Sequence, residues 1–243
     1  VALGVGAVTT RDNQIMLGTG STEITAASLS GSGKAIVSAN GDGTLKRTDV
    51  SDNTLDALGC EGNGENAVCY GPGANATGTN TTALGAYSTA DATGAIATGA
   101  GATASGEQSV AVGQATKALG KQSTALGAAS YANGIGSIAL GGESIADGTD
   151  VMAQGRGASA KGNDTIAIGS QSTTSGRNAL AFGVQSFADG SDVMALGAGA
   201  RATGSRATAV GVGATTTRNN QVMLGTATDE VTVANLAGSG KAI

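Results

Sequence analysis

The chain has 243 residues and a net charge of −5, with 42 glycines, 2% aromatic residues, one proline and no histidine. Its 13 Lys and Arg residues form no basic run, so neither nucleic acid nor an anionic membrane is an expected partner. Without histidine, the usual catalytic triads and imidazole metal sites are excluded, and we expect no enzyme and no cofactor. The composition is too apolar for ordinary disorder and lacks the collagen period, which favours a repetitive fold.

The first segment, residues 1–36, is a copy of the last one. Residues 1–36 align without gaps with residues 208–243, and 24 of 36 positions are identical. The chain also begins in the middle of a repeat, at VALGVG. We interpret it as part of a longer, modular protein that contains the tail of one module, a connector, a full repeat domain and a second tail.

The connector, residues 37–70, contains a hairpin signal and both cysteines. Two alternating runs flank Asn40-Gly41-Asp42-Gly43, a sequence that favours a β-hairpin. Cys60 and Cys69 bracket a ten-residue loop, and a zinc site is disfavoured because no second cysteine pair or histidine accompanies them. Two buried thiols remain an alternative, but we expect a disulfide, which indicates an oxidising, extracellular setting.

Residues 71–213 carry glycine at a fixed period. From 71 to 211, glycine occupies twenty of the twenty-one positions that lie seven residues apart, and Ala92 is the exception. Two glycines per fourteen residues indicate two turns per coil, with a strand of about five residues between turns. The apolar pattern has period two, which excludes a helix. The sequence therefore predicts an all-β, two-sided β-solenoid with 14-residue coils, about ten to eleven of them.

Every second glycine of this period, from Gly71 to Gly211, is called here a main glycine, and the glycines midway between them form the second series. The strand before each main glycine alternates large apolar residues with an alanine two positions before the glycine, and these two sets must lie on opposite faces. We expect the large set to fill the roll and the alanines to point outward against another copy of the chain. The opposite assignment would leave an apolar stripe that also needs a cover, so both predict a homo-oligomer. The predicted roll core is Val110, Val112, Leu126, Ile138, Leu140, Ile166, Ile168, Leu180, Phe182 and Leu196; the predicted interface between copies is Ala111, Ala125, Ala139, Ala153, Ala167, Ala181 and Ala195.

After Gly211 the pattern breaks at Arg218, in the segment 214–243. Coils of the form S-V-A-[VIL]-G-x-x-[AS]-x-A-x-G, followed by N-Q-V-x-L-G-T, resemble the heads and necks of trimeric autotransporter adhesins, the YadA-like family. The resemblance covers 71–243 and 1–36. It implies a left-handed parallel β-roll head at 71–213, a neck at 214–243, and the end of a preceding head plus neck at 1–36. The implied neck residues are Arg218, Asn220, Gln221, Val222, Leu224, Val231 and Leu236.

The same resemblance implies a homotrimer at the bacterial cell surface that binds host matrix proteins, cells or surfaces. It implies contact with the outer membrane only through regions outside this chain. Variable residues of the return strand form the candidate ligand surface: Lys117, Tyr131, Phe187 and Arg201. Weak contacts repeated in three copies would give avidity. The alternative is a spacer module of a surface fibre, or of a phage tail fibre, that binds nothing itself.

Two further motifs carry oxygen ligands. ADGTD at 146–150 and ADGSD at 188–192 could hold cations through Asp147, Asp150, Asp189 and Asp192, but such residues more often form turns. We therefore expect no metal site.

Overall fold

The computed structural model describes the residues 2–3, 16–17, 35–39, 45–49 and 64–231. All regular elements in these ranges are strands, and none of the described segments is a helix that could cross a membrane. The chain divides into two compact units, Val1–Leu55 and Asp56–Ile243. The division falls inside the predicted connector.

The first unit contains two strand pairs. β1 (Ala2–Leu3) pairs in parallel with β2 (Met16–Leu17), with Ala2 opposite Met16. Their counterparts in the duplicated segment, Ala209 and Met223, are paired in the same way in the second unit. β3 (Ala35–Ala39) pairs antiparallel with β4 (Leu45–Asp49), on either side of the predicted turn.

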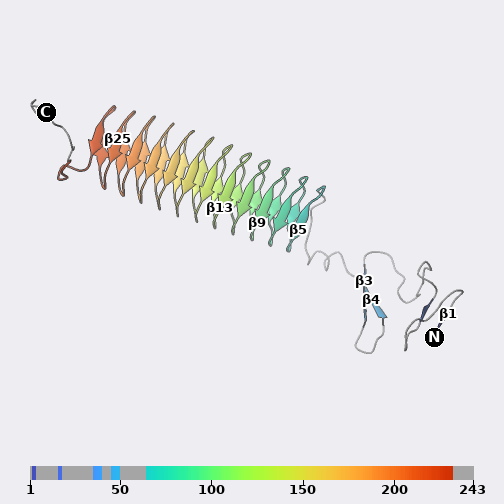
Figure 1. Cartoon of the computed structure of the whole chain (residues 1–243). Helices are drawn as coiled ribbons and strands as arrows, with labels where there is room; N and C mark the ends of the chain where they lie inside the picture. Colours follow the sequence, from blue (N-terminus) through green and yellow to red (C-terminus); the bar gives the residue numbers. More distant parts are fainter. Residues whose placement is uncertain (1, 4–15, 18–34, 40–44, 50–63, 232–243) are drawn as a thin grey trace, which may run out of the picture. The chain divides into compact units, whose positions relative to one another are not determined.

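The second unit is a two-sided β-solenoid (Figure 1). Its odd-numbered strands form a twelve-stranded sheet, called here the odd sheet, and its even-numbered strands form an eleven-stranded even sheet. The odd sheet contains β5 (Val68–Tyr70), β7 (Thr82–Leu84), β9 (Ile96–Thr98), β11 (Val110–Val112), β13 (Thr124–Leu126), β15 (Ile138–Leu140), β17 (Met152–Gln154), β19 (Ile166–Ile168), β21 (Leu180–Phe182), β23 (Met194–Leu196), β25 (Thr208–Val210) and β27 (Val222–Leu224). The even sheet contains β6 (Asn75–Ala76), β8 (Thr89–Ala90), β10 (Thr103–Ala104), β12 (Lys117–Ala118), β14 (Tyr131–Ala132), β16 (Ile145–Asp147), β18 (Ser159–Lys161), β20 (Thr173–Ser175), β22 (Phe187–Asp189), β24 (Arg201–Thr203) and β26 (Thr215–Thr216).

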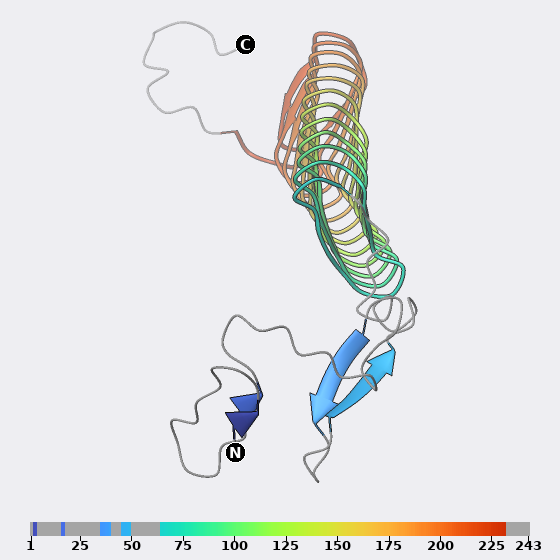
Figure 2. The same cartoon turned by 90° about the vertical axis from the view of Figure 1, so that its right-hand side faces the viewer.

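Each strand pairs in parallel with the strands one coil before and one coil after it, in a register of fourteen residues. Val110, for example, lies opposite Ile96 on one side and Thr124 on the other. Backbone hydrogen bonds link the corners of successive coils as well as the strands, so that the coils stack closely (Figure 2). The predicted parallel β-solenoid with 14-residue coils is confirmed. Its strands have two or three residues instead of the predicted five, because the corners take up the rest of each coil.

The glycine period reflects two different constraints at the corners. Gly141, of the main series, has a φ of +125°, and a Cβ there would lie 2.8 Å from the carbonyl carbon of Gly155 in the next coil. At Gly134, of the second series, a Cβ would overlap the carbonyl oxygen of Gly148. Both corners therefore need glycine for space. The main series also needs it for its positive φ, as does the second series from Gly148 to Gly204.

A pair of adjacent glycines tests this account of the corners. We expect Gly141→Ala to lower the free energy of unfolding by about 2 kcal/mol or more, because it combines a strained φ with a backbone clash. Gly142→Ala should change it by no more than about 0.5 kcal/mol, since the nearest atom to its Cβ would be the carbonyl oxygen of Ala128 at 3.7 Å. Denaturant titrations followed by circular dichroism measure both. Equal losses would contradict the account.

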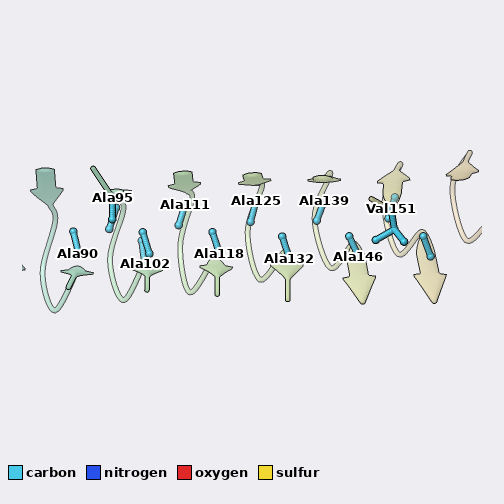
Figure 3. Packing of buried hydrophobic residues seen from close by; sticks show 14 of the residues in the cluster. Ala90, Ala95, Ala102, Ala111, Ala118, Ala125, Ala132, Ala139, Ala146 and Val151 are labelled. Carbon is cyan, nitrogen blue, oxygen red and sulfur yellow. The ribbon is translucent and has the colours of Figure 1, made fainter. Parts of the chain in front are cut away.

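The interior of the roll is built from small side chains. Alanine rows from the two sheets face each other, with Ala111, Ala125 and Ala139 opposite Ala118 and Ala132 (Figure 3). These side chains are fully buried, and the remaining inward positions hold Ser, Thr, Ala and Val. The largest fully buried side chains among the described residues are valines, at positions 151 and 193. The fully buried positions described between the sheets therefore hold nothing larger than valine, while Met223 packs half-buried against the same core at the end of the roll.

The predicted assignment of faces is wrong for the odd sheet. The residues predicted to form a trimer interface are fully buried inside one chain: Ala111, Ala125, Ala139, Ala153, Ala167, Ala181 and Ala195. The residues predicted to form the roll core lie on the outer face of the odd sheet, where they are half-buried or exposed: Val110, Val112, Leu126, Ile138, Leu140, Ile166, Ile168, Leu180, Phe182 and Leu196. The physical reason is volume, because the return strand also turns alanines inward and the two rows pack directly on each other.

Buried hydroxyl groups in the interior fall into two classes. The Ser130 hydroxyl donates to the carbonyl oxygen of Gly127 at 2.9 Å, and Ser88, Ser144, Ser172 and Ser186 make the equivalent bond in their own coils. The hydroxyls of a second set have no hydrogen-bond partner among the described residues: Ser109, Ser123, Thr165 and Thr174. The hydroxyls of the first class stabilise a corner. Those of the second class lower the stability of the fold, because they are buried without a hydrogen bond.

This difference predicts that removing the hydroxyl group affects the free energy of unfolding differently at two serines. We expect Ser130→Ala to lower the free energy of unfolding by about 1 kcal/mol, because it removes a hydrogen bond to a corner carbonyl. Ser123→Ala should leave it unchanged or raise it by up to about 1 kcal/mol, because an unsatisfied buried hydroxyl is removed. Thermal and urea unfolding check both, and a loss at Ser123 as large as that at Ser130 would refute the distinction.

Candidate functional site

The outer face of the odd sheet, called here the apolar face, is the first candidate. Alternation along each three-residue strand turns the middle residue inward and the two flanking residues outward. These outward residues form two columns that are apolar in every strand from β5 to β27, apart from Thr82, Thr98, Thr124, Gln154 and Thr208. Leu126 and Phe182 are each 48% exposed. An exposed apolar surface of this length indicates contact with a protein or another large partner.

The outer face of the even sheet, called here the polar face, differs in character. The four predicted ligand-surface residues all occupy its first column, and Lys117 lies directly opposite Tyr131 in the neighbouring strand. Phe187 lies opposite Arg201, whose guanidinium carbon is 4.0 Å from the centre of the Phe187 ring. Such a stacked pair holds both side chains against the sheet. The structure thus places the four residues in two clusters on one face.

The corners carry a feature that the sequence analysis missed. Two residues after each corner glycine, the backbone adopts positive φ, and this position is filled by Gly, Asn, Asp, Gln and a few other residues. Amide side chains at these positions bond between coils, as Gln122 does to Gln108 at 3.2 Å and Gln185 to Gln171 at 3.1 Å. Asn, Asp and Gln recurring two residues after the glycine were the signal in the sequence.

The acidic motifs belong to these corners. Asp150 and Asp192 have φ values of 54° and 59°, and the Asp192 carboxylate accepts a hydrogen bond from Asn178 at 2.8 Å. Asp147 accepts one from Asn133 at 3.0 Å. Within the described ranges, no three acidic or cysteine side chains gather as a metal site would require. The motifs therefore act as turn residues.

A shallow hollow of about 220 Å³ lies at the corner that follows the main glycines. It is lined by Glu143, Arg156, Gly157, Ser170 and Gln171. Gly157 occupies the positive-φ position between Glu143 and Gln171, so the hollow forms where one coil lacks a corner side chain.

The predicted neck begins as one more coil of the roll. β27 pairs with β25, and Val222 and Leu224 extend the apolar face at 66% and 49% exposure. At Arg218, where glycine is due, the Gln221 side-chain oxygen accepts hydrogen bonds from the backbone of Thr217 and Arg218. A side chain thus shapes this corner. Asn220 takes the usual positive-φ position, Val231 is exposed, and Leu236 lies outside the described residues.

Cys69 lies in β5, at the start of the odd sheet, and forms a disulfide. Cys60, the other cysteine of the chain, lies outside the described residues. Their pairing stays a prediction.

The chain resembles known proteins in a solved structure and in a family profile. No curated protein matches the chain. A solved structure, the crystal structure of the collagen-binding domain of the Yersinia adhesin YadA, is 26% identical with a TM-score of 0.38, over 69% of this chain and 78% of that one. The sequence profile of the YadA head domain repeat, in two copies, matches nine segments: residues 63–88, 76–102, 90–116, 104–130, 118–144, 132–153, 146–172, 175–200 and 202–220.

These segments together cover residues 63–172, 175–200 and 202–220, which is well over half of the chain and lies along the roll. The family is adhesive and structural, and its members are exposed on the bacterial surface. The chain therefore belongs to the YadA head family and forms an adhesin-type head.

Proposed function

We propose that three copies of the chain, each a left-handed parallel β-roll, assemble through their apolar faces into a trimeric head. This head attaches bacteria to host matrix proteins or cells through its polar faces. The observation that carries the proposal is the division of the roll into two unlike outer faces. One is predominantly apolar along twelve strands, with four threonines and one glutamine as its interruptions, and the other is polar and variable.

The regular spacing of side chains on the apolar face supports the proposal that another copy of the chain covers it. The face repeats its outward pair of side chains in every coil, at the spacing of neighbouring strands, about 4.8 Å. A partner that buries it over its whole length must present apolar groups at the same spacing. Another copy of the chain meets this condition without further assumptions, and closed symmetric assembly leaves no copy exposed.

The polar face is the part left free for a ligand by such an assembly. Lys117 with Tyr131, and Arg201 with Phe187, give it two clusters in which a cation lies beside an aromatic ring. Each cluster would recur three times in a trimer, so that weak contacts combine into avidity. The rest of the face carries mostly threonine and serine, with Ile145 and the charged residues Asp147, Lys161 and Asp189 among them.

The binding test compares the full chain with two variants on immobilised matrix proteins. We expect dose-dependent binding, and a loss of about tenfold or more in apparent affinity when Lys117→Ala and Arg201→Ala are combined, because each loss is repeated in three copies. Arg206→Ala, which removes an exposed cation at a corner, is the matched control and should bind as the parent chain does.

A spacer role is the second candidate, favoured by the duplication of residues 1–36 as 208–243. Heads joined end to end would carry another binding domain outward. A trimeric chain that binds no matrix protein or host cell at micromolar concentrations would favour this role over adhesion.

A further inference from the structure

The apolar face has a register problem. Because neighbouring coils present nearly the same side chains, a copy displaced by one coil, about 4.8 Å, would bury nearly the same apolar surface. Apolar contact alone therefore does not fix the height at which copies meet. Something in the face must distinguish the correct register from its neighbours.

Gln154 is the strongest interruption of the apolar pattern. It lies in β17, the seventh of the twelve strands of the odd sheet, between Leu140 and Ile168 in the same column. The other interruptions are threonines, which keep a methyl group for apolar contact. The Gln154 side chain is exposed, and its amide makes no hydrogen bond to any part of the chain that the structure describes.

We propose that Gln154 is a specificity-determining residue that sets the register of the copies in the assembly. The inference rests on the proposed trimer. At equal height, the Gln154 amides of three copies lie in one layer, where donors and acceptors can pair with one another. A slip of one coil would bury each amide against a leucine or an isoleucine. A single buried polar residue fixes register in other repetitive assemblies in this way, at some cost in stability.

The test uses disulfide trapping between two differently tagged copies of the full chain. One copy carries Leu126→Cys and the other Leu140→Cys, which lie one coil apart in the same column. A disulfide requires Cα atoms within about 7 Å, so trapping is sensitive to a slip of one coil. The measured quantity is the number of cross-links that join position 126 in one copy to position 140 in another, divided by the number that join the same position in two copies. A slip of one coil raises this ratio. The native cysteines are present throughout and cancel in the comparison.

We expect Gln154→Leu to raise this ratio about tenfold, because the buried amides no longer penalise the slipped register. The assembly mass should stay the same, and thermal stability should rise. Gln114→Leu is the control, because it makes the same change at an exposed residue of the corner between β11 and β12. It should leave the ratio as in the parent chain.

The outcomes separate the two proposals. A parent chain that is monomeric overturns the trimer and the register role together. A trimer whose cross-link ratio is the same with Gln154 and with leucine leaves the trimer intact and overturns the register role.

Discussion

Ala118→Leu should unfold the roll or lower its free energy of unfolding by about 3 kcal/mol or more. Ala118 is fully buried between Ala104 and Ala132 of the neighbouring strands, and no fully buried side chain described in the roll is larger than valine. Three extra heavy atoms must therefore separate the two sheets or distort β12, and overpacking on this scale is at the upper end of the usual cost. Urea titration followed by circular dichroism at 218 nm, roughly the β-sheet minimum, measures the loss.

The neighbouring residue provides the control. Lys117 lies in the same strand and points to the polar face, where it is exposed. Lys117→Leu introduces the same side chain and should change the free energy of unfolding by no more than about 0.5 kcal/mol. If Ala118→Leu were tolerated as well as Lys117→Leu, the alanine rows would not be the space-limited interior described above.

Leu140→Asp should dissociate the proposed trimer. Leu140 lies in β15, near the middle of the apolar face, with Leu126 and Gln154 beside it in the column. An aspartate there would bury three like charges in the assembly, a penalty that weakens association by more than about a hundredfold. Sedimentation at micromolar concentration should then give the mass of one chain, 23.0 kDa. The unfolding temperature should also fall, because binding no longer stabilises the folded chain.

An equivalent charge on the other face isolates the effect. Thr103 begins β10 in the even sheet and points to the polar face. Thr103→Asp should leave the mass unchanged, since that face stays in solvent. Dissociation by Thr103→Asp but not by Leu140→Asp would mean that the polar face is the contact between copies.

The sequence predicts the coil but not which way its strands face. A glycine every seven residues leaves little choice except a two-sided solenoid, and the structure confirms it. Period-two alternation, in contrast, divides each strand into two sets without saying which set is inside. The usual preference for large apolar residues in a core misled the assignment. The alanine that stands two positions before each main glycine from Gly85 to Gly211 was itself the sign of a position limited by space.

The candidate site was predictable to the same extent. Variation at Lys117, Tyr131 and Arg201 correctly indicated an outward column, because inward positions between close-packed sheets tolerate few residue types. The apolar face belonged to the less favoured of the two face assignments that the sequence left open. The positive-φ corners were missed because Asn, Asp and Gln alternate there with glycine and other residues. The backbone conformation that Gln122 and Asp150 share shows only in three dimensions.

Sedimentation equilibrium of the unmodified chain, from micromolar to low nanomolar concentration, tests the central claim most directly. The account predicts a mass near three times 23.0 kDa that persists on dilution, because the whole apolar face is buried between copies. A stable monomer over the same range would contradict it, since Leu126, Phe182 and Leu196 would then stay exposed to water with nothing to cover them.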